Sequence, residues 1–196
     1  MTLRTEEILT FWLEEAGPEK WYAVDEALDA EIRDRFGALW EEARTGTLDH
    51  WTSHPRKVLA LIILLDQFPR NMFRGTAKAF ATDHKAKTAA CYALKQQWDE
   101  RFDQQTRQFF YLPFMHSEVL PDQDHSVRLY ARKMADHRED SLPHAIAHRE
   151  IIRRFGRFPY RNAALGRKTS AKEQAFLESG GYGAVLQEAR SAAMCK

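Results

Sequence analysis

The sequence predicts an all-α protein of eight or nine helices in irregular antiparallel pairs. Three observations predict this class. Apolar residues recur at helical spacing in nearly every segment, capping residues with Gly or Pro separate those segments, and no alternating strand pattern of any length occurs. Helix starts are spaced about 20–30 residues apart, which favours stacked helix pairs without a regular sequence repeat.

The first half of the chain predicts three helices. Thr5 is the expected N-cap of the first, which continues until Gly17-Pro18 interrupts it. The second covers residues 25–44 and is followed by Gly46. The third begins at Pro55 and contains the apolar run 58–65, so we expect it to be the central, buried helix.

The second half predicts further helices in one domain that spans residues 1–196. Their expected starts lie at or near Asp83, Asp103, Asp122, Pro143 and Ser170. Residues 170–173 match a capping box, and the helix from Pro143 should reach Phe155. Residues 184–196 are expected to form a short terminal helix or a tail.

The composition predicts a folded cytoplasmic protein. Hydrophobic residues make up 44% of the chain, and the net charge is +1. The longest apolar run is far shorter than the ~20 residues of a membrane-spanning helix, and the N-terminus lacks a secretory pattern. Cys91 and Cys195 lack metal or redox spacing, which favours a reduced, cytoplasmic setting. The sequence leaves the oligomeric state open.

The chain contains one short motif twice, as QFPRNMFRG at 67–75 and as RFPYRNAALG at 157–166. Proline disfavours α conformation in the preceding residue, so we expect Phe68 and Phe158 to leave their helices in extended conformation. The asparagines are then expected to cap a short helical turn that the glycines end. The sequence therefore predicts two equivalent corners.

Charged residues at these corners are the first functional candidates. A corner needs no guanidinium, yet four arginines lie within or beside the two motifs: Arg70, Arg74, Arg157 and Arg161. Asp66 lies at the C-terminal end of its helix, against the helix dipole, so we expect it to face one of these arginines. The arginines could hold a carboxylate or phosphate, or they could be paired internally.

Histidines and a glutamate are the second set of candidates. His116 and Glu118 could act as acid and base, although Glu118 could equally supply charge near a helix start. His144 and His148 share one helix face, but the pattern of a zinc protease is absent. His148 should point inward, either as a hydrogen-bonded core residue or as a pocket residue facing Glu118 or Asp66.

Three stretches together resemble one bacterial family: LLDQFPRNMFRGTAKAFATD (64–83), FFYLPFMHSE (109–118) and HREIIRRFGRFPYRNAALGR (148–167). The family is the domain of unknown function 924, and the resemblance covers residues 5–182. It implies a TPR-like all-helical bundle or solenoid in a bacterial cytosol. It implies no activity.

These candidates lead to one functional hypothesis, the binding of a small anionic ligand, with or without its turnover. Glu118, His148 and His116 are the predicted catalytic residues. The predicted ligand-binding residues are Asp66, Arg70, Asn71, Arg74, Arg161 and Asn162. We predict no metal, no cofactor and no membrane partner, and the helical phase of the arginines disfavours nucleic acid. Whether the protein is an enzyme stays open. The alternatives are a peptide-binding helical groove and, more weakly, divalent-metal hydrolysis.

Overall fold

The computed structural model describes residues 3–194, and these residues are helical or irregular, with no strand. The all-α prediction is confirmed. The chain divides into two compact units at Pro113/Phe114. The expectation of one domain over residues 1–196 stays a prediction, as does TPR-like packing. Cys195 and Lys196 lie outside the described residues.

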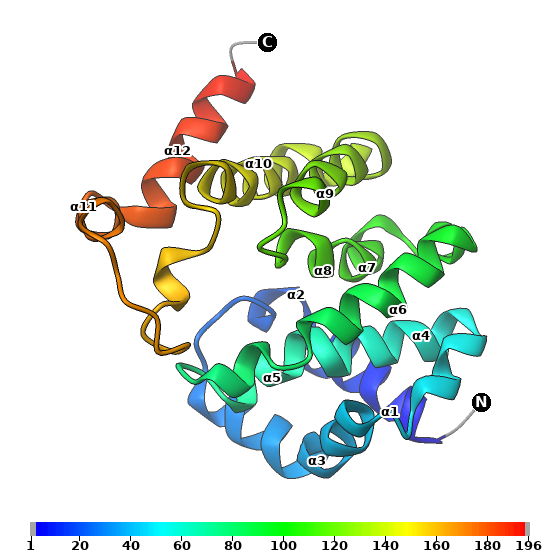
Figure 1. Cartoon of the computed structure of the whole chain (residues 1–196). Helices are drawn as coiled ribbons and strands as arrows, with labels where there is room; N and C mark the ends of the chain where they lie inside the picture. The colour runs from blue at the N-terminus through cyan, green and yellow to red at the C-terminus, as the bar shows by residue number, and fades with distance from the viewer. Residues whose placement is uncertain (1–2, 195–196) are drawn as a thin grey trace. The chain divides into compact units, whose positions relative to one another are not determined.

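Figure 1 labels the helices of the first unit. Its longer helices are α1 (Leu3–Thr10), α3 (Glu26–Thr45), α4 (Pro55–Ile62) and α6 (Asp83–Lys95). Its short α-helical segments are α2 (Gly17–Lys20), α5 (Phe68–Met72), α7 (Gln104–Arg107) and α8 (Leu112–Met115), the last of which crosses the unit boundary. Two π-helical segments are η1 (Phe11–Ala16) and η3 (Ile63–Gln67). Four 3₁₀ segments are η2 (Asp49–Ser53), η4 (Ala77–Phe80), η5 (Trp98–Arg101) and η6 (Gln108–Phe110).

The apolar run 58–65 forms the buried centre of the first unit, as predicted. Each of its side chains is at most 2% exposed. The run extends from α4 into η3, and α4 packs against α1 and α6. A helix that is apolar on every side can be stable only when it is enclosed in this way.

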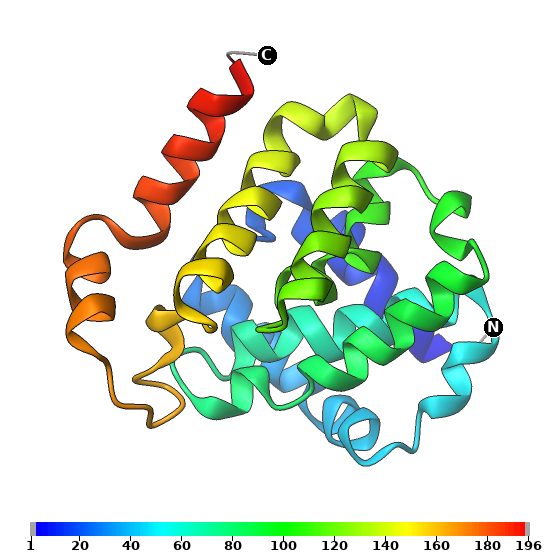
Figure 2. The same ribbon diagram turned by 45° about the horizontal axis from the view of Figure 1, so that its top comes forward.

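The second unit contains α9 (Leu120–Lys133), α10 (Arg138–Phe155), α11 (Ala171–Glu178) and α12 (Gly181–Met194). Two 3₁₀ segments, η7 (Ala135–His137) and η8 (Pro159–Arg161), connect them. Figure 2 shows α9 and α10 side by side, and α10 also packs against α12. The core of this unit is formed by Ala147, Ile151, Ile152, Phe158, Phe176 and Val185.

Most of the predicted helix boundaries are confirmed. Asp25 caps α3 by accepting hydrogen bonds from the amides of Ala27 and Leu28, and Gly46 ends the helix in left-handed conformation. Ser170 and Glu173 form both bonds of the expected capping box. Local side-chain chemistry therefore determines these ends.

Other predicted boundaries are wrong. Thr5 does not cap the first helix, because α1 begins at Leu3 and buries Thr5. The helices expected from Asp122 and Pro143 begin earlier, at Leu120 and Arg138. Pro121 lies in the first turn of α9, where a missing N–H costs no helical bond, whereas Pro143 lies inside α10.

The two corners are not equivalent. Phe158 is extended, with φ −90° and ψ 107°, but Phe68 is helical, with φ −56° and ψ −40°. The chain passes from α4 through η3 into α5 without leaving helical conformation. The prediction is therefore correct for Phe158 and wrong for Phe68.

Candidate functional site

In the first unit, Asp66 lies within η3 and is fully buried. Its carboxylate accepts a hydrogen bond of 2.5 Å from Gln67 Nε2 and lies 3.5 Å from Arg70 Nη1. Arg70 also donates to Asp83, with two bonds of 3.0 and 3.1 Å, and to the carbonyl of Asp66. The expectation that Asp66 faces a corner arginine is confirmed.

The other polar residues of this corner bind Asp29 of α3. Asn71 Nδ2 donates to Oδ1 at 2.8 Å, and Arg74 donates to both carboxylate oxygens at 2.8 and 2.9 Å. Burial alone would raise the pKa of Asp29, but the hydrogen bonds from Arg74 and Asn71 hold that pKa below its ordinary value. Asn71 is thus not a helix cap. It joins two helices.

These contacts show how the guanidinium groups of the first corner are used. Arg70 is bound by Asp83 and Arg74 by Asp29. The sequence analysis did not identify either of these two carboxylates as a partner. Asp29 lies 45 residues from Arg74 along the chain, so no local pattern links them. A ligand role for Asp66, Arg70, Asn71 and Arg74 stays a prediction.

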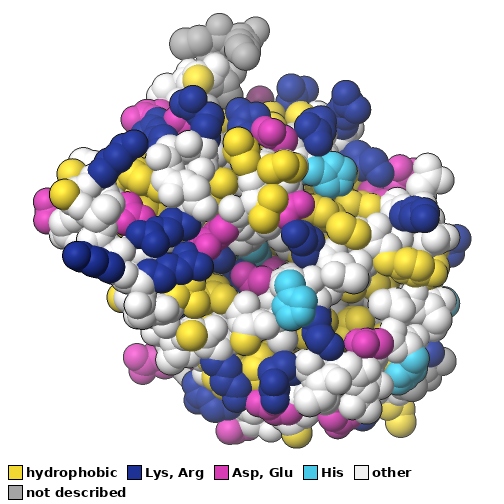
Figure 3. Space-filling view, viewed as in Figure 1, with side chains coloured by type: hydrophobic (Ala, Val, Ile, Leu, Met, Phe, Trp, Pro, Cys, Tyr) yellow, Lys and Arg dark blue, Asp and Glu magenta, His cyan; other side chains and the backbone are white. Residues whose placement is uncertain are grey.

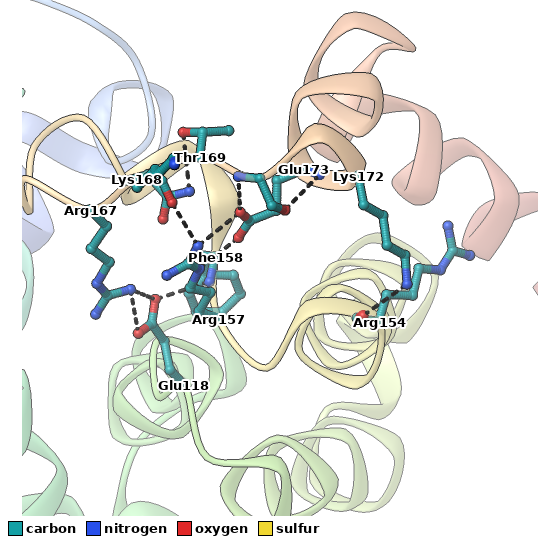
Figure 4. Close-up of polar contacts among 11 residues, drawn as sticks. Glu118, Arg154, Arg157, Phe158, Arg167, Lys168, Thr169, Lys172 and Glu173 are labelled. Atoms are coloured by element: carbon teal, nitrogen blue, oxygen red, sulfur yellow. Dashed lines mark hydrogen bonds and ion pairs between the residues drawn. The ribbon is translucent and has the colours of Figure 1, made fainter.

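In the second unit, Glu118 holds the second corner in place. Figure 4 shows its carboxylate accepting bonds from the Phe158 amide, at 2.9 Å, and from Arg167, at 2.8 and 2.9 Å. Because Phe158 is extended, its backbone N–H is free of helical bonding and can donate to Glu118. One alternative for His148 was a pocket residue facing Glu118, but both oxygens of Glu118 are used in these contacts with Phe158 and Arg167.

Arg157 is bound by Glu173, which joins the corner to the start of α11 (Figure 4). The two bonds are 2.6 and 2.8 Å long, and Glu173 also accepts from the Ser170 amide at 2.8 Å. The Arg157 guanidinium, followed by the Ser170 amide, lowers the pKa of Glu173.

Residues 149–168 of the second unit form a basic segment, and many of its arginine side chains are in ion pairs. Figure 3 shows Lys and Arg side chains around α11 with acidic side chains among them. The further ion pairs of this segment are Arg153–Glu150, Arg154–Glu150, Arg154–Glu188 and Arg149–Asp124.

A cluster of three histidines, His116, His144 and His148, forms beside this corner. The ring centroid of His148 lies 6.4 Å from that of His116, 5.0 Å from Tyr182 and 5.5 Å from Phe158. His148 Nδ1 is hydrogen-bonded to the carbonyl of His144 at 2.8 Å. Because a carbonyl can only accept, Nδ1 carries the proton and Nε2 presents a lone pair.

Burial and charge keep His148 neutral. Burial lowers its pKa to about 3, and the charges of His116, Arg161 and His144 act in the same direction. Its neighbour His144 is bound through Nδ1 to the hydroxyl of Tyr182 at 2.5 Å. Burial raises the pKa of Tyr182 to about 12, so this hydroxyl keeps its proton in the contact with His144.

Arg161 and Asn162 are the remaining candidates in the second unit. Arg161 is only 6% exposed, and its guanidinium lies over the ring of Phe158, 4.5 Å from the centroid. Asn162 does not cap a helix as expected. Its Nδ2 donates to Thr169 Oγ1 at 3.3 Å, and its buried Oδ1 lacks a hydrogen-bond partner among the described residues.

The structure therefore distributes the predicted site between the two units. Asp66, Arg70, Asn71 and Arg74 lie in the first, and His116, Glu118, His148, Arg161 and Asn162 lie in the second. Their convergence on one pocket stays a prediction. The sequence analysis missed Tyr182, whose position between Gly181 and Gly183 gave no signal of a contact 38 residues away.

Across residues 3–194, no group of three or more His, Cys, Asp or Glu side chains is arranged to hold a metal ion. No helix within this range is both long enough and apolar enough to cross a bilayer.

Comparison with protein families decides the identity of the chain. The family described as "Bacterial protein of unknown function (DUF924)" matches residues 8–181. The chain belongs to the DUF924 family. The three stretches that resembled this family at 64–83, 109–118 and 148–167 all lie inside the match.

A solved structure resembles this DUF924 chain closely. It is a protein of unknown function from Agrobacterium tumefaciens, 41% identical, with a TM-score of 0.83. The similarity covers 89% of this chain and 97% of that chain. Comparison with curated proteins gave no match.

Proposed function

We propose that the second unit binds a small anionic molecule, a carboxylate or a phosphate, at His116, His148 and Arg161. The observation that carries this proposal is the position of Arg161, whose nearly buried guanidinium lies over the ring of Phe158 while His148 packs on the same ring. The charge of Arg161 also lowers the pKa of His148. The same positive charge that disfavours a proton on His148 favours an anion beside it.

The geometry supplies groups suited to this role. Phe158 is a shared wall, since Arg161 lies over its ring at 4.5 Å and His148 contacts it at 5.5 Å. A nearly buried guanidinium binds carboxylates and phosphates through parallel N–H donors, and low exposure strengthens those bonds. Arg161 is therefore the main anchor for an anion, with His116 as a second donor.

The contacts of the neighbouring charged residues support placing the site here. Glu118 and Glu173 bind Arg167 and Arg157 on the corner itself, where they fix the backbone around Phe158. We thus assign Glu118 a positioning role in this proposal. It orients the corner that presents Arg161 and does not accept a proton from the ligand.

The test is a titration of the full chain with sodium phosphate and sodium acetate, followed by NMR of the histidine rings and by thermal unfolding. Concentrations of about 10 mM detect dissociation constants of ~1 mM, an affinity of about 4 kcal/mol. We expect the His148 resonances to shift and the midpoint temperature to rise.

Two arginine variants make the test specific. Arg161→Gln should reduce the response at least about tenfold, which corresponds to roughly 1.4 kcal/mol. Arg153→Gln is the matched control, because Arg153 lies on the same unit but is 65% exposed and pairs only with Glu150 of its own helix. Equal responses in both variants, or none in the wild type, would refute the proposal.

A further inference from the structure

We infer that the anion bound by the second unit also carries a hydrogen-bond donor, a hydroxyl or an amine, and that Nε2 of His148 accepts it. The ligand class is thus a small hydroxy- or amino-substituted carboxylate or phosphate. This inference rests on the proposed function and adds the chemical group that selects among anions.

The first step is the state of the imidazole ring. The 2.8 Å contact between Nδ1 and the carbonyl of His144 requires a proton on Nδ1. A neutral ring has only one such proton, so Nε2 is a pure acceptor. Both partners belong to consecutive turns of α10, so this tautomer is set within one helix.

The second step is that the His148 ring stays neutral near pH 6.5, where an ordinary histidine begins to bind a second proton. The groups around it come from each element that packs on it: His144 from α10, His116 after α8, Arg161 from η8 and Tyr182 from α12. The hydroxyl of Tyr182 is bound to His144, and burial together with the charge of Arg161 opposes a second proton on His148. Nε2 therefore remains an acceptor at neutral pH.

The third step concerns what already contacts the ring. Within the described residues, the hydrogen bond of His148 uses Nδ1, and its remaining contacts are with the rings of Phe158, Tyr182 and His116. An anionic oxygen placed against Nε2 would meet a lone pair and be repelled. The anionic group must therefore lie toward Arg161, and a donor on the ligand must lie toward Nε2.

This arrangement predicts discrimination between ligands. A site that offers a hydrogen-bonding group to the ligand rejects analogues that lack the matching group, because the buried group is then left unpaired. We expect a hydroxylated anion to bind at least about tenfold more tightly than the same anion without its hydroxyl.

The experiment compares two pairs of probes on the full chain labelled with ¹⁵N-histidine. Glycolate is titrated against acetate, and 2-hydroxyethyl phosphate against ethyl phosphate. Two-bond ¹H–¹⁵N spectra report the tautomer of His148 directly, and the same titrations give the dissociation constants. We expect the Nδ1–H tautomer in the free protein, and a shift of the Nε2 resonance with the hydroxylated probes.

Two histidine variants complete the design. His148→Phe keeps a ring of similar size but has no Nε2, so the affinity ratio within each pair should fall to near one. His137→Phe, in η7 of the same unit, should keep the wild-type ratio. The wild-type ratio itself needs no variant, so a poorly folded His148→Phe would leave the test intact.

The outcomes separate this inference from the proposed function. Binding of both members of each pair with equal affinity would overturn the donor inference while leaving anion binding in place. Uptake of a proton from solvent at Nε2 when acetate or ethyl phosphate binds would also overturn it, because the ring would then act as a donor. Failure of all four probes to bind would refute both proposals.

Discussion

The two Phe-Pro corners have nearly the same sequence and different structures. Two residues before the phenylalanine, the first motif has Asp66 and the second has Gly156. Gly156 adopts a left-handed conformation with φ +68° and ends α10, which allows Phe158 to be extended. Asp66 stays helical within the wider turn of η3, and the chain continues into α5.

The difference teaches that proline alone does not end a helix. Pro69 has no N–H for the carbonyl of Leu65, four residues earlier, and a regular helix would lose that bond. In the first corner the π-helical segment accommodates the ring, and the hydroxyl of Thr82 donates to the Leu65 carbonyl at 2.6 Å. A tertiary partner thus replaces the missing helical bond.

The two phenylalanines also have different surroundings, although both are fully buried. Phe68 packs against Phe36 at 4.8 Å and Trp12 at 5.5 Å, in the aromatic core of the first unit. Phe158 packs against His148, and Arg161 lies over its ring. Both rings belong to the core of their unit, but Phe158 also contacts a histidine and an arginine, whereas the contacts named for Phe68 are aromatic.

Thr82→Val should have the largest effect, on the first corner. The substitution leaves the Leu65 carbonyl without its donor and Trp40 Nε1 without the hydroxyl that accepts from it at 3.2 Å. Two buried groups without partners should lower the free energy of unfolding by about 2–4 kcal/mol. Urea denaturation measures this.

The matched control is Thr88→Val on α6, where the hydroxyl bonds only the carbonyl of His84 at an exposed position. It should change the free energy of unfolding by less than about 0.5 kcal/mol. Similar losses for the two threonines would show that the first corner does not depend on Thr82.

His148→Phe should change how stability depends on pH. The lowered pKa of His148, about 3 against an ordinary 6.5, means that only the unfolded chain binds a proton there between these values. The contribution of His148 to stability is complete above about pH 6.5 and is lost as pH falls toward 3, by up to about 1.4 kcal/mol per pH unit. His148→Phe should remove this part of the slope.

Urea denaturation at a series of pH values between about 3 and 8 measures that slope, because this range covers the interval between the two pKa values. His137→Phe serves again as the control and should retain the wild-type slope. If the His148→Phe slope matched the wild type, the ring would not be neutral in the folded protein, and the acceptor assigned to Nε2 would be wrong.

Gly156→Ala should have the smallest effect, on the second corner. A side chain at φ +68° is strained even though no atom lies within 4 Å of the added Cβ, so the expected loss is about 1 kcal/mol. Gly37→Ala, inside α3 without positive φ, should instead stabilise the protein by about 0.5–1 kcal/mol. Thermal unfolding of both variants checks the opposite signs.

Much of the fold could be predicted from sequence because its signals act within one helical turn. The caps at Asp25 and Ser170 and the stop at Gly46 each depend on residues within a few positions. The burial of 58–65 follows from an apolar run with no polar side. The error at Phe68 arose because the group that replaces the lost helical bond, Thr82, is 17 residues from Leu65.

Sequence by itself thus determined that this chain is helical, where most helices begin and end, and which residue types gather at its corners. Tertiary structure decided which charges pair, as in Arg157 with Glu173 and Arg74 with Asp29, and which nitrogen of His148 keeps its proton. The physical reason is distance along the chain. Capping is a local interaction, whereas ion pairing and the desolvation of a ring depend on neighbours that only folding brings together.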